Sequence, residues 1–244
     1  MSITYSSTYD SPDLRGKEEI RPWDIHDVLR RFWKPGFTVL DVGCGTCAKT
    51  AWMLPESGRF IAIDPSPLMR DAASERLGSS SKVQVLDGTS AAIPCDSASV
   101  SYLLSIMAPY DLTEYSRVMA PGGLCIMEMV GEFDKLTLKE AFPPDAKGYR
   151  GQLQDTLYPA RAIELRTGLE RHALEIVLFA EGRWNSWFSR PQLEALLLNT
   201  NVLRSFSPES PADKQILDRY EAKHRTGDGI TLLNHRYLIV GRLP

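Results

Sequence analysis

Long hydrophobic runs are absent from this sequence, since no apolar stretch reaches the roughly 18–20 residues that a membrane-spanning helix needs. Cysteine is scarce as well: four residues in 244 exclude a small scaffold held together by disulfides. Charge of one sign does not dominate. The 28 basic and 31 acidic residues give a net charge of −3, which argues against a protein that binds nucleic acid through overall positive charge. Residues 1–5 carry neither a basic start nor an apolar stretch, so we expect no secretory signal and a cytoplasmic protein.

What is present is an ordinary globular composition, with 43% hydrophobic and 24% charged residues. From residue 37 onward, short apolar runs typical of buried strands alternate with helical segments. This alternation predicts an α/β fold with a doubly wound, mostly parallel sheet. The predicted strands cover 37–42, 60–63, 83–86, 100–105, 124–130, 174–179 and 231–242. The predicted helices cover 24–33, 46–54, 111–119, 189–198 and the stretch between Ser66 and Gly78.

The same pattern suggests how the chain is divided. Residues 1–36 are predicted to be an N-terminal helical segment and residues 37–244 the sheet domain, in which 131–173 break the alternation as an insertion. The segment before the first helix combines cations with an aromatic ring, among them Arg15 and Trp23. It is predicted to close over a ligand as a lid, because a cation can pair with a carboxylate and an aromatic ring can shield a cation. The alternative is an ordinary solvated terminus.

Polar side chains follow the predicted strands at the point where each strand ends. Asp41, Asp64, Asp87 and Ser105 each lie at or just beyond the end of a different strand. In a parallel sheet these ends share one edge, and ligands bind in the crevice outside it. The four residues are therefore predicted to line one crevice.

A glycine-rich loop joins the first of these strands to the next helix. The spacing of Gly43, Gly45 and Ala48 fits the dinucleotide fingerprint, and Asp64 follows about 20 residues later, where an acid that binds a ribose belongs. A nicotinamide enzyme is therefore one hypothesis. However, Asp41 stands before the loop and repels a pyrophosphate, which needs a helix N-terminus free of anions. S-adenosylmethionine has an ammonium, a sulfonium and a ribose but no phosphate, and it suits the two acids better.

Four motifs in order resemble the class I S-adenosylmethionine-dependent methyltransferases, in particular their type 11-like members. The glycine loop resembles the family's first motif, and Ile61–Ser66 resembles its acidic second strand. Residues 86–94 resemble the loop that carries the acid contacting adenine, and 117–123 resemble the helix-to-strand turn before the fifth strand. Cys47 departs from the family, which often has a third glycine there. The resemblance implies a Rossmann-like sheet of seven strands whose last strand is antiparallel.

The resemblance also implies a role for each matched residue. Asp41, Gly43 and Gly45 would hold the methionine end of S-adenosylmethionine, and Asp64 would accept hydrogen bonds from the ribose hydroxyls. Asp87 would take the adenine amine beside the Gly88 backbone, and Ser105 would lie near the transferable methyl group. Thr46 and Pro65, which lie within the same motifs, are counted with the cofactor-binding residues, as are Arg15 and Trp23 of the lid.

Other chemical motifs are weak. Cys44-x-x-Cys47 could bind zinc or act in redox chemistry, but the remaining cysteines have no paired spacing, and none of the four histidines pairs with another at i, i+4. No metal is therefore predicted. A methyl transfer to an amine or thiolate needs no proton-accepting residue, because the sulfonium is already activated. Tyr110 and Asp111 are the candidates for orienting or deprotonating the acceptor.

The acceptor is left open among three classes. A small molecule is the first hypothesis, with the protein acting as a monomer or homodimer. RNA or a protein is the second, because residues 106–123 are similar to ribosomal RNA guanine-N1 methyltransferases and Arg150, Arg161, Arg166 and Arg171 could form a basic groove. Those enzymes begin with a four-cysteine zinc module that contacts RNA, whereas residues 1–36 contain no cysteine. A non-catalytic partner protein that binds S-adenosylmethionine is the third.

Overall fold

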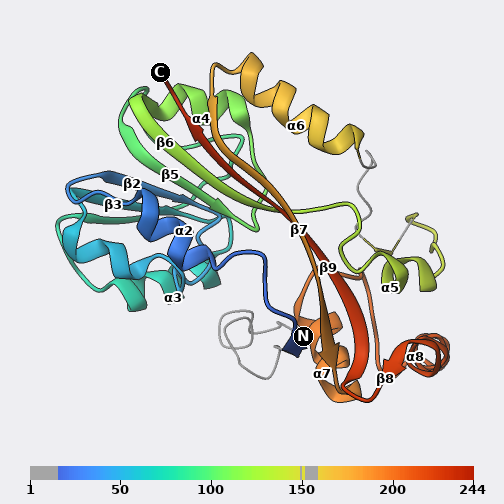
Figure 1. Cartoon of the computed structure of the whole chain (residues 1–244). Helices are drawn as coiled ribbons and strands as arrows, with labels where there is room; N and C mark the ends of the chain where they lie inside the picture. Colours follow the sequence, from blue (N-terminus) through green and yellow to red (C-terminus); the bar gives the residue numbers. More distant parts are fainter. Residues whose placement is uncertain (1–15, 149, 152–158) are drawn as a thin grey trace. The chain divides into compact units, whose positions relative to one another are not determined.

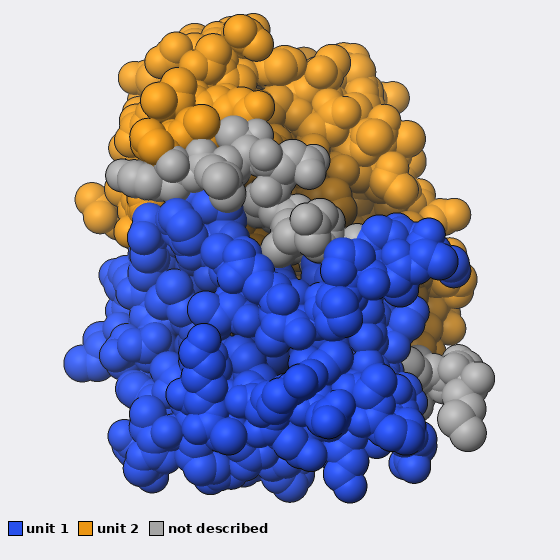
Figure 2. Space-filling view, turned by 90° about the vertical axis from the view of Figure 1, so that its right-hand side faces the viewer, with its two compact units in different colours: residues 1–22, 131–158, 182–236 blue, residues 23–130, 159–181, 237–244 orange. Residues whose placement is uncertain are grey.

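A computed structural model describes residues 16–148, 150–151 and 159–244. The chain divides into two compact units, which Figure 2 shows in different colours. Unit 1 consists of residues 1–22, 131–158 and 182–236, and unit 2 consists of residues 23–130, 159–181 and 237–244. All the motifs of the predicted cofactor crevice therefore belong to unit 2.

Unit 2 contains the parallel sheet that the sequence predicts (Figure 1). Its parallel strands are β2 (Thr38–Val42), β3 (Arg59–Ile63), β4 (Val83–Leu86), β5 (Val100–Ile106) and β6 (Met119–Val130). β2 pairs in parallel with both β3 and β5, β3 pairs with β4, and β5 pairs with β6. Their spatial order is β6-β5-β2-β3-β4, so the chain reverses direction across the sheet at β2 and β5. In open α/β sheets ligands bind at such a reversal.

The remaining strands of the described residues are β1 (Lys17–Glu18), β7 (Glu175–Phe188), β8 (Arg225–Thr226) and β9 (Gly229–Arg242), so nine strands are present where seven were predicted. The additional two are the two-residue strands β1 and β8. The last strand is antiparallel, as predicted: at the start of β6, Gly122 N–H donates to Leu243 O and Gly123 O accepts from Leu243 N–H, just past the end of β9. A mostly parallel sheet with an antiparallel last strand is thus confirmed.

Helix boundaries follow local capping chemistry. Asp24 accepts from His26 N at the start of α2 (Ile25–Phe32), and Ser66 accepts from Met69 N before Pro67 opens α3 (Pro67–Leu77). Asp111 caps α4 (Leu112–Val118), and Ser189 forms a capping box with Gln192 at α7 (Arg190–Asn199). These helices were predicted. In the described part of the chain three further helices were not predicted, namely α5 (Leu136–Ala141), α6 (Ala160–Arg171) and α8 (Pro211–His224).

The predicted helix over 46–54 is wrong. The chain there forms turns and then a short 3-10 helix, η2 (Ala51–Glu56). Cys47 adopts a left-handed backbone with a φ of 56°, which an α-helix does not tolerate, and its N–H closes a tight turn on Cys44 O. Pro55 lacks the N–H that a longer helix needs. The predicted strand over 174–179 is also longer than expected, because β7 continues to Phe188.

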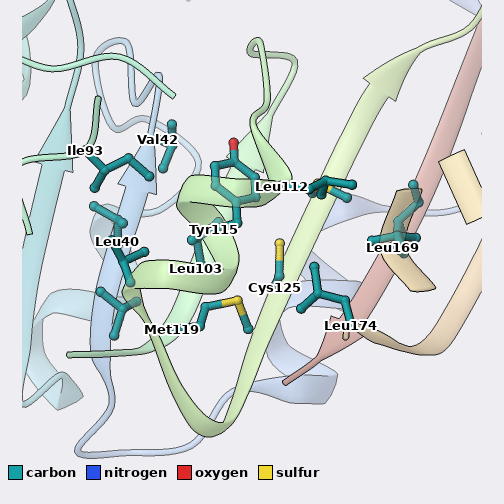
Figure 3. Close-up of a cluster of buried hydrophobic side chains, with 14 of the residues drawn as sticks. Leu40, Val42, Ile93, Leu103, Leu112, Tyr115, Met119, Cys125, Leu169 and Leu174 are labelled. Atoms are coloured by element: carbon teal, nitrogen blue, oxygen red, sulfur yellow. The ribbon is translucent and has the colours of Figure 1, made fainter. Parts of the chain in front are cut away.

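The core of unit 2 has two layers because successive strand residues face opposite sides of the sheet. One cluster joins Leu40, Leu103 and Cys125 to Tyr115 of α4 and Leu169 of α6 (Figure 3). The other joins the alternate residues of the same strands to α2 and α3; its members include Val39, Phe60, Tyr102, Leu29, Ala73 and Leu77. Helices therefore cover both faces, and the carboxyl edge of the sheet is where polar residues collect. Unit 1 has a separate hydrophobic cluster, built around Leu138, Phe188, Leu217 and Ile230.

Candidate functional site

The loop after β2 is folded tightly against the end of β3. Gly43 and Gly45 have positive φ values of 66° and 53°, which glycine adopts without steric cost. Gly43 N–H and Cys44 N–H both donate to Ile63 O, at 2.9 and 3.0 Å. Gly45 N–H donates to Asp64 Oδ2 at 3.0 Å. A Cβ on Gly43 would lie 2.5 Å from Ala108 Cβ, so only glycine fits where this loop meets the segment after β5.

The bonding of this loop argues against a dinucleotide. A pyrophosphate site needs free backbone N–H groups at the start of an α-helix. Here the N–H groups of Gly43, Cys44 and Gly45 are bonded to the end of β3, and no α-helix follows the loop directly. A ligand without phosphate fits this arrangement better.

Asp64 directly follows β3 and is buried, with 8% of its surface exposed. Both carboxylate oxygens accept from the backbone: Oδ2 from Gly45 N–H and Oδ1 from Ser66 N–H at 2.9 Å. A carboxylate has about four lone-pair sites, so it can hold these two bonds and still accept from a diol. Asp64 thus links the glycine loop to the start of α3. Pro65, the next residue, is exposed at the same edge.

Asp41 lies within β2, opposite Ala62 of β3 and Leu104 of β5, and is buried. Its Oδ2 accepts from Thr50 Oγ1 at 2.6 Å. Burial raises the pKa of Asp41 to about 6, and the Thr50 hydrogen bond opposes that rise. A nearby cation, such as an ammonium group, would favour the charged form. Thr46, at the end of the loop, is buried as well.

This burial predicts a pH-dependent contribution to stability. Because the folded pKa of Asp41 is raised above its unfolded value, the stabilisation is fully present below the unfolded pKa and is lost as the pH rises through about 6. Between pH 4 and 7 the wild type should therefore lose on the order of 2–3 kcal/mol more unfolding free energy than Asp41→Asn, which cannot ionise. Urea unfolding of both proteins across this range is the measurement. If the unfolding free energies of the two proteins change with pH in the same way, Asp41 does not have the raised pKa described here.

Asp87 follows β4 and is largely exposed, with 76% of its side-chain surface accessible. Its Oδ1 accepts from Arg70 of α3 at 3.0 Å, and the same Arg70 nitrogen donates to Asp64 O at 2.8 Å. Arg70 therefore ties together the ends of β3 and β4. Gly88 packs closely on Pro94, whose Cδ lies 2.9 Å from the position of a Cβ.

Ser105 lies on β5, beside Asp41 in the strand order, and only 1% of its surface is exposed. Its Oγ lies beside the hydroxyl of Tyr115, and this contact opposes the rise in the Tyr115 pKa that burial causes. Two residues later, Met107 adopts a φ of 61°, and its N–H donates to Glu128 O at 2.7 Å. Strained backbone of this kind collects at ligand-binding sites.

The two candidate catalytic residues follow this turn. Asp111 Oδ1 accepts from Thr113 N–H and Glu114 N–H, so one of its oxygens is committed to capping α4. Tyr110 is half-buried and packs against the cluster of Figure 3. Their roles toward an acceptor stay predictions.

Trp23 and Glu128 form a contact that links the chain before α2 to the carboxyl end of β6. Trp23 Nε1 donates to Glu128 Oε1 at 2.9 Å, and Glu128 is buried opposite Ile106 of β5. Glu128 was not predicted as a site residue. The signal that could have identified it is an acidic residue near the end of a predicted apolar strand. Arg15 lies outside the described residues.

Comparison with known proteins points to methyl transfer. Residues 39–123 match the family model for a methyltransferase domain, which covers the glycine loop, all three acids and Ser105. The chain carries a methyltransferase domain and has the fold of class I S-adenosylmethionine-dependent methyltransferases. It is 29% identical over 154 residues to the uncharacterized methyltransferase YrrT of Bacillus subtilis (strain 168), covering 61% of this chain and 68% of that protein.

Solved structures agree with this methyltransferase fold. The YcgJ protein from Bacillus subtilis matches with a TM-score of 0.60 at 15% identity, covering 89% of this chain and 95% of that one. Geranyl diphosphate C-methyltransferase from Streptomyces coelicolor A3(2) matches with a TM-score of 0.52 at 15% identity, covering 90% and 78%. At these identities the likeness establishes the fold.

The methyltransferase's own residues fit its cofactor, S-adenosylmethionine. The three acids and Ser105 come from four neighbouring strands in the order β5-β2-β3-β4, and the carboxylates of Asp41 and Asp64 are both buried at this edge, where an ammonium group and a ribose diol can pair with them. Within the described part of the chain, no three His, Cys, Asp or Glu residues are grouped to hold a metal ion. Burial raises the pKa of the Cys44 thiol, after the larger effect of its hydrogen bond with Cys47, so this pair is suited to packing and poorly suited to nucleophilic chemistry. No described helix is long and apolar enough to cross a membrane.

Proposed function

We propose that this methyltransferase moves the methyl group of S-adenosylmethionine to a small-molecule acceptor at the carboxyl edge of β5, β2, β3 and β4. The observation that carries this proposal is the row of polar groups along four adjacent strand ends, braced by the Gly45–Asp64 and Arg70–Asp87 hydrogen bonds. The cofactor-binding set is Asp41, Gly43, Gly45, Thr46, Asp64, Pro65, Asp87, Gly88 and Ser105, with Trp23 beside it.

The roles follow from charge and position. Asp41 faces the ammonium end of the cofactor, Asp64 accepts from the ribose hydroxyls, and Asp87 accepts from the adenine amine. When bound, S-adenosylmethionine supplies a methyl group activated by its sulfonium. The protein's task is then alignment and exclusion of water, which can supply much of the acceleration. Ser105 Oγ orients groups beside the transferable methyl, and Tyr110 orients the acceptor.

Three observations favour a small acceptor. The net charge is −3, so no overall positive field attracts a nucleic acid. Within unit 1, Arg150 is fully engaged in a bidentate pair with Asp213, at 2.6 and 2.7 Å, and is not free for a phosphate backbone. One fold neighbour is described as acting on geranyl diphosphate, a small molecule. We further propose that the protein is cytoplasmic and acts as a monomer or homodimer.

The acceptor class can be tested with radiolabelled cofactor. The protein is incubated with methyl-tritiated S-adenosylmethionine and either a deproteinised metabolite extract, total RNA or a protein extract. Label transferred to the small-molecule fraction supports the proposal. Label found only in RNA or protein overturns it. The matched control is Asp64→Ala, in which transfer should fall in every fraction.

The segment before α2 is proposed to close over the cofactor. Trp23 ties this segment to Glu128, so ordering it should protect its backbone amides. We expect hydrogen exchange near residue 23 to slow when S-adenosylhomocysteine is added, and a chain lacking residues 1–21 to fold but bind it more weakly. Equal exchange with and without ligand would show that the segment is only a terminus, and Arg15 and Trp23 would leave the site.

A further inference from the structure

Unit 1 contains a buried cluster of charged groups that shares no residue with the cofactor-binding motifs. Lys135 Nζ donates to both oxygens of Asp134, at 3.1 and 3.2 Å, and to Asn234 Oδ1 at 3.1 Å. Arg236 also pairs with Asp134. Although burial alone raises its pKa, Lys135 and Arg236 hold the pKa of Asp134 at about 2. Asp134 therefore pairs with two cations, and Glu18 adds a second negative charge that acts on Lys135.

A third cation in this cluster, Lys139, has no carboxylate of its own among the residues that the structure describes. Lys139 follows Lys135 by one helical turn and is 5% exposed, with Gly151 packed over its stem. In the described part of the chain, Lys139 Nζ makes no hydrogen bond or ion pair. The charges that act on it are Asp134, which favours its protonated form, and Lys135 and Arg236, which oppose it. Burial, added to these two cations, lowers the pKa of Lys139 to about 8.

A neutral donor in the same cluster also has no acceptor. Trp184 Nε1 is buried and without a hydrogen-bond partner among the described residues. The Trp184 ring lies 5.8 Å from the Arg236 guanidinium carbon, and Trp184 O accepts from Asn234 Nδ2 at 3.3 Å. Trp184 is thus connected to the cations through Arg236 and Asn234. An unpaired buried cation and an unpaired buried N–H both cost stability, and both need the same thing, an acceptor oxygen with negative charge.

We propose that Lys139, Lys135, Arg236 and Trp184 form a binding site for an anionic oxygen group, a carboxylate or a phosphate, carried by a small ligand. The chemistry is that of a charge-assisted hydrogen bond from Lys139 Nζ, in a surrounding where three cations outnumber the carboxylates of Asp134 and Glu18. This site belongs to unit 1 and goes beyond the methyl transfer proposed above. It stands or falls independently of the cofactor site in unit 2.

A purely structural role for Lys139 makes different predictions. If Lys139 contributed an ion pair to the fold, its removal would leave an uncompensated carboxylate and destabilise the protein. If Lys139 instead binds an anionic ligand, its charge is unpaired in the free protein. The nearly isosteric Lys139→Met then removes that buried charge and should leave the thermal midpoint of unfolding unchanged or raise it. The two roles therefore differ in sign.

The experiment measures thermal unfolding of the full chain at neutral pH in sodium phosphate, sodium acetate or sodium chloride of equal ionic strength. The wild type should gain about 3 °C or more from phosphate or acetate relative to chloride, because a ligand that binds the folded state stabilises it. Lys139→Met should lose this gain, and Lys139→Arg should keep part of it. Lys147→Met, which removes an exposed lysine of the same unit, is the matched control and should respond as the wild type does.

A second readout follows the lysine directly. In protein labelled with carbon-13 at lysine Cε, the anion that binds should raise the pKa of Lys139 by about one pH unit or more, since it favours the protonated form. A response to phosphate alone assigns a phosphate site, and a response to acetate assigns a carboxylate site. Equal thermal gains in the wild type and Lys139→Met, with an unmoved Lys139 pKa in both salts, would overturn the proposal.

Discussion

Asp64→Ala is expected to weaken binding of S-adenosylhomocysteine by at least about 10-fold. Each charge-assisted hydrogen bond from a ribose hydroxyl is worth roughly 1.5–3 kcal/mol, and the variant loses the acceptor of both. It also frees Gly45 N–H and Ser66 N–H, which the carboxylate holds in place. Isothermal titration calorimetry gives the affinity, and circular dichroism verifies that the variant is folded.

A second carboxylate provides the control for Asp64. Asp71 is an exposed residue of α3 in the same unit. Asp71→Ala changes the net charge by the same amount but should leave affinity within about twofold, because long-range effects of an exposed charge are screened by salt. A folded Asp64→Ala protein that binds as tightly as Asp71→Ala would remove Asp64 from the site.

Gly43→Ala should abolish measurable cofactor binding, a loss of about 100-fold or more. The new Cβ meets Ala108 Cβ at 2.5 Å, and the residue must also keep a φ of 66°, which alone costs about 1–2 kcal/mol. The loop and the segment after β5 must therefore move apart, which displaces Asp64 from Gly45 N–H. Titration of the folded variant with S-adenosylhomocysteine measures the effect.

Two further variants separate strain from the clash. In Gly122→Ala the alanine must keep a strained φ of 77°, but nothing lies within 4 Å of its new Cβ. This variant should therefore lose stability and keep its affinity for the cofactor. Adding Ala108→Gly to Gly43→Ala removes the Cβ–Cβ contact and should restore part of the binding. If Gly43→Ala alone binds normally, the loop does not hold the cofactor closely.

The parallel sheet and its crevice were predictable because their signals are local. Asp64 and Asp87 each directly follow an apolar strand, so they could be placed at one edge from strand order alone. The caps Asp24, Ser66 and Ser189 were predictable for the same reason, since each lies beside the backbone groups that it binds.

The features that were missed depend on contacts between distant residues. The segment 46–54 has helical apolar spacing, but Cys47 takes a left-handed backbone so that the loop can bond to β3, and tertiary contacts override local propensity. Glu128 accepts its hydrogen bond from Trp23, which lies more than 100 residues earlier in the chain. In the cation cluster of unit 1, Lys135 bonds to Asn234, which lies 99 residues later in the chain. The periodicity of a sequence reports local structure and cannot predict such a contact.

The most direct test of the central claim is calorimetric titration of the wild-type protein with S-adenosylhomocysteine and, separately, with NAD. The glycine loop has its N–H groups bonded to the end of β3, and Asp41 lies buried behind it. Together these features exclude a pyrophosphate and admit the demethylated cofactor. We predict saturable heat with S-adenosylhomocysteine, one site per chain, and no heat with NAD. Tight NAD binding with no heat from S-adenosylhomocysteine would contradict the account.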